Sequence, residues 1–160
     1  MIFSRLLVSV LLLGFVFLSS CSDDSVAAST SSGTMTATVN GTAYNGNFAA
    51  AASHKNGTLT VLGKDNTNQI ISFSLFSITG TGVYNLGPAS MNIHSAEYFD
   101  ATGVIWHVAQ TIGSGSVNVT KLTSTDVEGT FNFVAEIVPG TAGSGTKTIT
   151  NGAFSMKLTQ

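Results

Sequence analysis

The chain has 160 residues, of which 43% are hydrophobic and only 9% are charged, and its 6 Lys and Arg residues against 8 Asp and Glu residues give a formal net charge of −2. This balance excludes a basic nucleic-acid-binding protein, which needs a positive surface to neutralise phosphates, and a disordered chain, which would be rich in charge and poor in apolar residues. The single cysteine excludes an internal disulfide framework.

The first twenty residues have the features of a secretory signal peptide. Arg5 supplies a positive charge, and the apolar run Leu6–Leu18 follows it. A helix needs about 20 residues to span a bilayer, so this run is too short for a transmembrane helix and has the length of a signal-peptide core. We therefore predict that residues 1–20 are removed from the mature protein.

The order Leu18-Ser19-Ser20-Cys21 resembles the lipobox of bacterial lipoproteins. The resemblance implies that a diacylglyceryl group is attached to the sulfur of Cys21, that the chain is cleaved before this residue, and that the new amino group is acylated. Two or more acyl chains hold a protein stably at a membrane. The expected partner of this end of the chain is therefore the membrane itself.

The residues after the cysteine bear on where the protein is sorted. In lipoproteins an aspartate directly after the cysteine favours the inner membrane, whereas Ser22 here favours the outer membrane. The acidic pair Asp23-Asp24 resembles the surface-export signal of Bacteroidota lipoproteins. We expect an outer-membrane protein displayed at the cell surface, with a periplasm-facing anchor as the alternative.

Beyond the anchor we expect two regions. Residues 21–33 are small and polar without periodicity, which predicts a flexible tether. Residues 34–160 are long enough for one domain with a real core, expected to be monomeric.

Alternating apolar residues between turn signals predict nine or ten strands in this domain. The segment 48–55 is the weakest of them, because its alanines also suit a helix. Asn56-Gly57 is typical of a type I′ hairpin turn, and the run 69–78 is apolar on both faces, which predicts a central strand covered on both sides. Glycines around Tyr84 and Leu86 predict a longer loop. In chain order the predicted strands are 35–40, 48–55, 58–64, 69–78, 91–100, 104–112, 116–122, 130–138, 146–150 and 154–158.

This pattern predicts an all-β fold, either an antiparallel β-sandwich or a flattened meander-type barrel, with a calycin-like up-and-down barrel as a further alternative. Five segments in this order resemble an uncharacterised family of small Bacteroidota lipoproteins: Met35–Gly41, Gly82–Gly87, Gly115–Leu122, Glu128–Phe133 and Thr148–Phe154. The resemblance implies a β-fold and an envelope location. It brings no activity and no catalytic residues.

The sequence contains no recognisable catalytic or metal-binding motif. The only thiol is Cys21, no G-x-S-x-G element is present, and His54, His94 and His107 belong to no metal-ligand spacing. Glu128 and Glu136 are eight residues apart on a strand, roughly 25 Å, which is too far for paired carboxylates of a glycosidase. We therefore expect no cofactor and no metal.

One hairpin is a candidate surface patch. If residues 101–102 or 102–103 form a two-residue loop, even positions before it share a face with odd positions after it. Trp106 and Val108 would then lie in the core with Ile93, Phe99 and Ile112. The opposite face would carry His94, Tyr98, Asp100 and His107, which could bind a sugar or weakly bind a metal.

The leading functional hypothesis is a non-catalytic binding or structural module on the outer membrane. One alternative is an accessory lipoprotein that binds a glycan or small ligand. An enzyme of unrecognised type would need two or more of His54, His94, Glu97, Asp100 and His107 to meet within about 4 Å in a pocket. A subunit that binds another envelope protein would need an unpaired edge strand.

Overall fold

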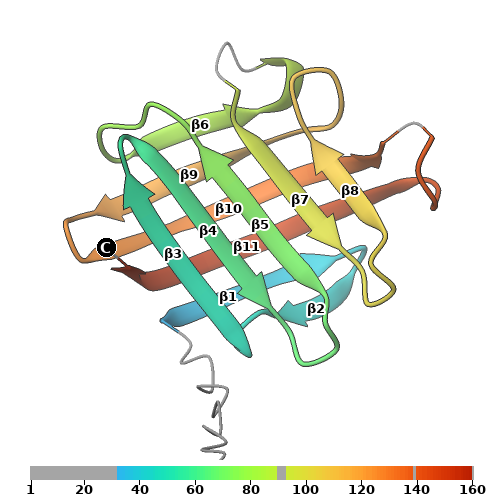
Figure 1. Cartoon of the computed structure of the whole chain (residues 1–160), viewed down its shortest axis with the longest axis horizontal. Helices are drawn as coiled ribbons and strands as arrows, with labels where there is room; N and C mark the ends of the chain where they lie inside the picture. The colour runs from blue at the N-terminus through green and yellow to red at the C-terminus, as the bar shows by residue number, and fades with distance from the viewer. Residues whose placement is uncertain (1–31, 90–92, 139, 160) are drawn as a thin grey trace, which may run out of the picture.

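The computed structural model describes residues 32–89, 93–138 and 140–159, and it confirms the all-β prediction (Figure 1). These residues form eleven strands in one sheet and one short 3-10 helix, η1 (Gly87–Ala89). The strands are β1 (Gly33–Val39), β2 (Thr42–Asn45), β3 (Ala49–Lys55), β4 (Thr58–Lys64), β5 (Ile70–Leu75), β6 (Gly82–Leu86), β7 (Ser95–Phe99), β8 (Ile105–Val108), β9 (Ser114–Leu122), β10 (Asp126–Ile137) and β11 (Thr146–Thr159).

The sheet folds into the two layers of a β-sandwich. The meander β3-β4-β5-β7-β8 forms the front layer in Figure 1, and β6, β9, β10, β11, β1 and β2 cross behind it. Two residue pairs between β11 and β3, and two between β8 and β10, join the layers at their edges. Both β10 and β11 pair with three strands, and β11 runs parallel to β3. This branching distinguishes the fold from the up-and-down barrel considered as an alternative.

The core lies between the two layers, where each strand turns alternate side chains inward. Phe73 of β5 packs against Phe131 of β10 and Phe154 of β11, with ring centroids 5.6 and 5.2 Å away. All three side chains are buried. The aromatic cluster therefore connects the front layer directly to the two longest strands of the back layer.

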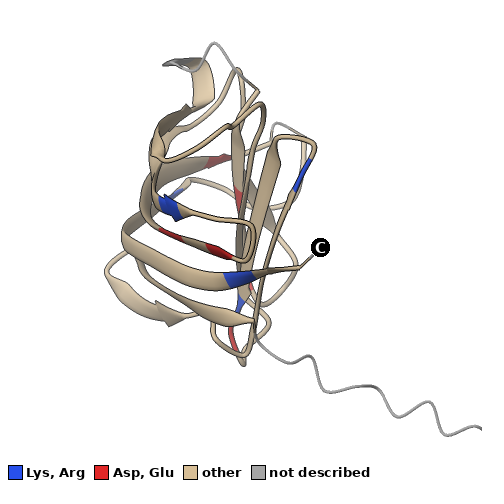
Figure 2. Ribbon diagram, turned by 90° about the vertical axis from the view of Figure 1, so that its left-hand side faces the viewer, with Lys and Arg blue, Asp and Glu red and all other residues tan. Residues whose placement is uncertain are grey.

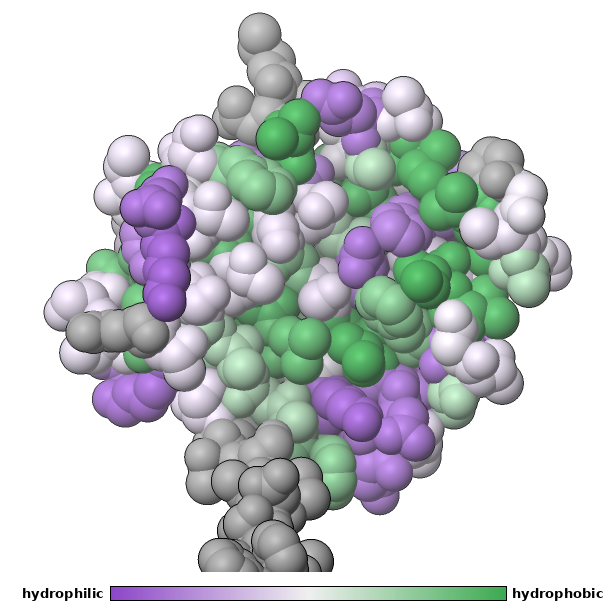
Figure 3. Space-filling view, in the orientation of Figure 1, coloured by the Kyte–Doolittle hydropathy of each residue, from purple (hydrophilic) through white to green (hydrophobic). Residues whose placement is uncertain are grey.

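The outer face of the front layer mixes polar and apolar side chains (Figure 3). On β5, Ile71 and Phe73 are buried, whereas Ile70 and Ser72 on the other face are partly exposed. The strand is central, with β4 and β7 on its two sides. The prediction that it is covered on both sides was wrong, because no second layer packs on the outer face among the described residues.

The strongest local turn prediction was correct. Lys55 of β3 pairs with Thr58 of β4, and Asn56 and Gly57 between them have φ values of 51° and 74°. Positive φ at both central residues is the geometry of a type I′ turn, which matches the twist of the strands it connects. This turn also makes the alanine-rich segment 49–55 a strand, by pairing it along its whole length with β4.

Three other predictions need correction. The expected loop around Tyr84 contains edge strand β6, which pairs with β9 from Gly82 to Leu86. The two predicted C-terminal strands are one strand, β11, with a bulge at Asn151 (φ 53°) where its pairing with β1 and β10 shifts. Gly33 begins β1 and so belongs to the sheet, whereas residues 21–31 of the predicted tether, with Cys21, lie outside the described residues.

Candidate functional site

The predicted patch does not form, because the β7–β8 hairpin has the opposite parity. Tyr98 pairs with Trp106, and Glu97 pairs with His107. His94 and Tyr98 are each only 3% exposed and face the core, whereas His107 lies on the outer face. Trp106 and Val108 are buried as expected, but Ile93, expected in the core beside them, is 55% exposed.

The reason is a loop one residue longer than expected. The backbone N–H of Asp100 donates to the carbonyl of Val104 at 3.0 Å, so the loop consists of the three residues 101–103, with Gly103 at φ 86°. One additional residue reverses every side chain on the second strand relative to the first. The carboxylate of Asp100 accepts hydrogen bonds from Thr102 and Val104, and these bonds, led by the Thr102 hydroxyl, lower the pKa of Asp100. Asp100 is therefore a turn residue.

His94 has a structural role inside the sandwich. Its Nδ1 accepts a hydrogen bond from the backbone N–H of Phe76 at 3.1 Å, and its ring meets Tyr84 edge-on at 5.6 Å between centroids. Burial lowers the pKa of His94. The neutral imidazole is thus the form that the fold requires, because a protonated Nδ1 cannot accept this bond.

We expect this histidine to make folding pH-dependent. The unfolded chain, with a His pKa of about 6.5, takes up the proton before the folded chain does, so stability falls as the pH drops below about 6.5. The contribution is at most about 1.4 kcal/mol per pH unit. Urea unfolding at pH 7.5 and pH 5.5 should show a smaller loss for His94→Asn, whose side-chain oxygen can replace Nδ1, than for the wild type. Equal losses in the two proteins would contradict this role.

His107 contacts the carboxylate of Glu97, which was not part of the predicted patch. Its Nδ1 lies 3.3 Å from Oε1 of Glu97, and Glu136 is its cross-strand neighbour on β10. His107 also borders an apolar groove of about 290 Å³ beside Val104, Ile105 and Val138. The hydroxyls of Thr102 and Thr141 in this groove donate to Asp100 and to the carbonyl of Val138. Glu97 and His107, two of the five residues named above for a possible enzyme, therefore meet within 4 Å. His54 and His94 of the same set lie elsewhere.

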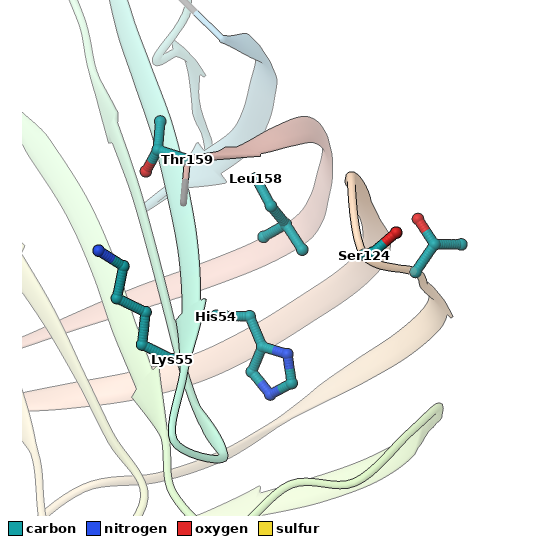
Figure 4. Close-up of a pocket in the computed structure, with 6 residues that line it drawn as sticks. His54, Lys55, Ser124, Leu158 and Thr159 are labelled. Carbon is teal, nitrogen blue, oxygen red and sulfur yellow. The ribbon is translucent and has the colours of Figure 1, made fainter.

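His54 lines a second cavity, of about 360 Å³, where the end of β11 passes β3 (Figure 4). Its imidazole and Leu158 point into this space opposite the turn at Ser124, whereas Lys55 lies on the other side of β3. The Nε2 atom of His54 is buried without a hydrogen-bond partner among the described residues.

A third cavity, of about 250 Å³, opens where the β1–β2 turn meets the beginnings of β5 and β11. We call it the end site; Asn40, Tyr44, Gln69, Tyr98 and Lys147 are among the residues that line it. The ammonium of Lys147 lies 4.4 Å from the centroid of the Trp106 ring and 5.6 Å from that of Tyr98. A cation, aromatic rings and two side-chain amides therefore converge here, which is the composition of a small polar binding site.

The turn before β5 holds the end site in place. The buried carboxylate of Asp65 accepts hydrogen bonds from the backbone N–H groups of Thr67 and Gln69, each at 2.8 Å. The Gln69 side-chain oxygen in turn accepts from the Tyr98 hydroxyl, and the Tyr44 hydroxyl donates to the carbonyl of Gly63. Burial raises the pKa of both tyrosines, so both remain protonated donors.

Sequence reasoning missed the end site almost entirely. It expected Tyr98 on an outward patch and did not consider Asn40, Gln69 or Lys147. One signal was available: Lys147 has the same parity as Ile149, which is buried, so it is a lysine at an inward position. The other residues come from separate strands and are brought together only by the sandwich.

The described residues contain no group of three or more His, Cys, Asp and Glu side chains arranged to hold a metal ion. The ionisable residues are sparse and interspersed over both layers (Figure 2). Within the described ranges there are three ion pairs, and two of them are exposed lysine–carboxylate contacts, Lys121–Glu128 and Lys157–Asp126.

Comparison with known proteins gives one result. No curated protein and no solved structure matches this chain. Residues 31–156 match the family described as Domain of unknown function (DUF6252), and this match takes in β1 to β10 and most of β11. The chain therefore belongs to the DUF6252 family.

Proposed function

We propose that this protein is a lipid-anchored outer-membrane protein, displayed at the cell surface, whose β domain acts as a non-catalytic binding or structural module. The observation that carries the proposal is the order Leu18-Ser19-Ser20-Cys21, which begins with the last residue of a signal-like apolar run and precedes the first strand by about a dozen residues. Among the described residues no helix is both long and apolar enough to cross a membrane. Acyl chains on Cys21 would supply the attachment.

The roles of four of the six acidic residues that the structure describes support a non-catalytic domain. Asp65 and Asp100 stabilise turns through their carboxylates, as described above. Asp126 accepts from Thr125 and Lys157, and Glu128 accepts from Lys121. Catalytic carboxylates generally lie in a cleft with a perturbed pKa and open access to substrate. These four carboxylates instead contact the protein's own backbone and side chains.

The end site favours the first alternative, an accessory lipoprotein that binds a glycan or small ligand. It combines aromatic rings with amide and ammonium donors in one cavity. A structural partner from the envelope would instead use a sheet edge. Strand β6 lies at one edge, has no charged residue, and leaves Val83 65% exposed. Uncharged edges of this kind are suited to strand addition.

The anchor is tested by replacing Cys21 with serine. In cells fed an alkyne-labelled fatty acid, the wild type should incorporate label and sediment with outer membranes. Cys21→Ser should incorporate none and be lost from the outer-membrane fraction, because serine lacks the thiol that accepts the diacylglyceryl group. Ser25→Ala, which retains the thiol and lies outside the lipobox and the sorting residues, is the matched control.

Protease treatment of intact cells then separates the two orientations. Degradation of the labelled protein indicates surface display, and protection indicates the periplasm-facing alternative. Label on Cys21→Ser at the wild-type level would overturn the anchor proposal.

A further inference from the structure

Lys147 is placed differently from the ion-paired lysines of this protein. It lies at an inward position of β11, is partly buried, and its ammonium lies against the rings of Trp106 and Tyr98. Lys121 and Lys157 have carboxylate partners at 2.8 and 2.6 Å, whereas no carboxylate of the described residues forms an ion pair with Lys147. A partly buried cation that faces a cavity and has no carboxylate in direct contact is suited to bind an anion.

Two amides add hydrogen-bond donors to the same cavity. The side-chain oxygen of Asn40 accepts from the N–H of Thr148 at 2.8 Å, which leaves its NH₂ group without a partner among the described residues. The oxygen of Gln69 is occupied by Tyr98, and one N–H of its amide donates to Thr67 at 3.0 Å, so a second N–H remains. In both amides the side-chain oxygen already accepts a hydrogen bond, and the nitrogen keeps at least one N–H available, so the cavity offers hydrogen-bond donors to a ligand.

Asp65 and Asp100, whose charges act on Tyr98 of this cavity, do not line it. Asp65 uses its carboxylate oxygens on Thr67 and Gln69, and Asp100 uses one on its own turn, although its charge still interacts with that of Lys147. The cavity volume of about 250 Å³ lies below the ~300–1,000 Å³ of sites for drug-sized ligands, so it suits one small ring.

We propose that the end site binds a small carboxylate ligand, with Lys147 as its ionic partner and Asn40 and Gln69 as hydrogen-bond donors. An acidic sugar unit and a free organic acid share this chemistry. The inference rests on the binding role proposed above and is independent of the anchor. Gly33, where the tether joins β1, is seven residues before Asn40, roughly 20 Å of extended chain. The site therefore lies at the other end of β1 from Gly33, the end that follows the proposed anchor.

The single tryptophan provides a direct readout, because Lys147 lies against its ring. The full chain, in a sugar-free non-ionic detergent, is titrated with D-glucuronate while the emission of Trp106 is recorded. We expect a saturable change that Lys147→Gln weakens tenfold or more and that Lys147→Arg largely retains. Lys55→Gln removes the same charge at a distant site and should bind like the wild type. Far-UV circular dichroism confirms that each variant is folded.

Further titrations identify the class of ligand. Glucose, which has the ring without the carboxylate, should not bind, and acetate tests the carboxylate without the ring. Stronger binding of glucuronate than of acetate indicates an acidic sugar, and equal binding indicates a free carboxylate. In NMR spectra of the wild type, the side-chain NH₂ signals of Asn40 and Gln69 should shift on binding.

Absence of carboxylate binding, equal binding of glucose, or binding that leaves both amide signals unchanged would overturn the inference. The fatty-acid labelling of Cys21 would be unaffected by any of these outcomes. Failure of this site is therefore distinguishable from failure of the proposed anchor.

Discussion

Phe131→Ala is expected to lower the free energy of unfolding by about 3–5 kcal/mol, because it removes the central ring of the core. Phe131 is fully buried, and its ring centroid lies 5.6 Å from that of Phe73 and 6.3 Å from that of Phe154. The loss combines the transfer of the ring to water with the cavity that remains between two rigid layers. Because domains of this size have a total stability of about 5–15 kcal/mol, the variant should lose a large share of its stability.

The measurement is urea unfolding followed by circular dichroism, with Phe48→Ala as the matched control. Phe48 is 64% exposed, so the same truncation there should change stability by no more than about 0.5 kcal/mol. Equal effects of the two substitutions would show that the aromatic cluster does not connect the two layers as described.

Gly129→Ala is expected to lower the free energy of unfolding by about 1–3 kcal/mol or more, because the added methyl group overpacks the core. Gly129 of β10 pairs with Phe154 of β11, and Gly152 pairs with Phe131, so each ring lies over a glycine of the neighbouring strand. A Cβ at Gly129 would lie 2.3 Å from the carbonyl oxygen of Asn118 and 2.7 Å from the Phe154 ring. Neither neighbour can move freely, because the first is backbone and the second belongs to the core cluster.

Gly80→Ala is the control for this substitution. A Cβ at Gly80 would meet nothing within 4 Å, and its φ lies outside the left-handed region. Alanine there should be neutral or slightly stabilising, since it restricts the unfolded chain. Thermal unfolding of both variants tests the difference. A Gly129→Ala protein as stable as the Gly80→Ala protein would mean that β10 and β11 do not approach as closely as described.

Much of the fold follows from local sequence. Strict alternation in segments such as 58–64 and 130–138, and the Asn56-Gly57 turn, predicted the correct strands because period-two burial and positive φ are properties of a few neighbouring residues. The same local rules could not decide β6 or the length of the β7–β8 loop. In the β7–β8 loop, one residue more than expected reversed the face on which the side chains of β7 lie relative to those of β8. This reversal placed His94 and Tyr98 in the core.

By itself, the sequence determined the all-β class, most of the strands and the expectation of a lipid anchor, since each depends on contiguous residues. Only the tertiary structure decided which side chains meet. Lys147, Gln69 and Asn40 are far apart in the chain and converge because β11 and β5 begin at the same end of the sandwich as the β1–β2 turn. The contacts Gly129–Phe154 and His107–Glu97 likewise depend on strand order and register, which arise from the packing of two layers around one core.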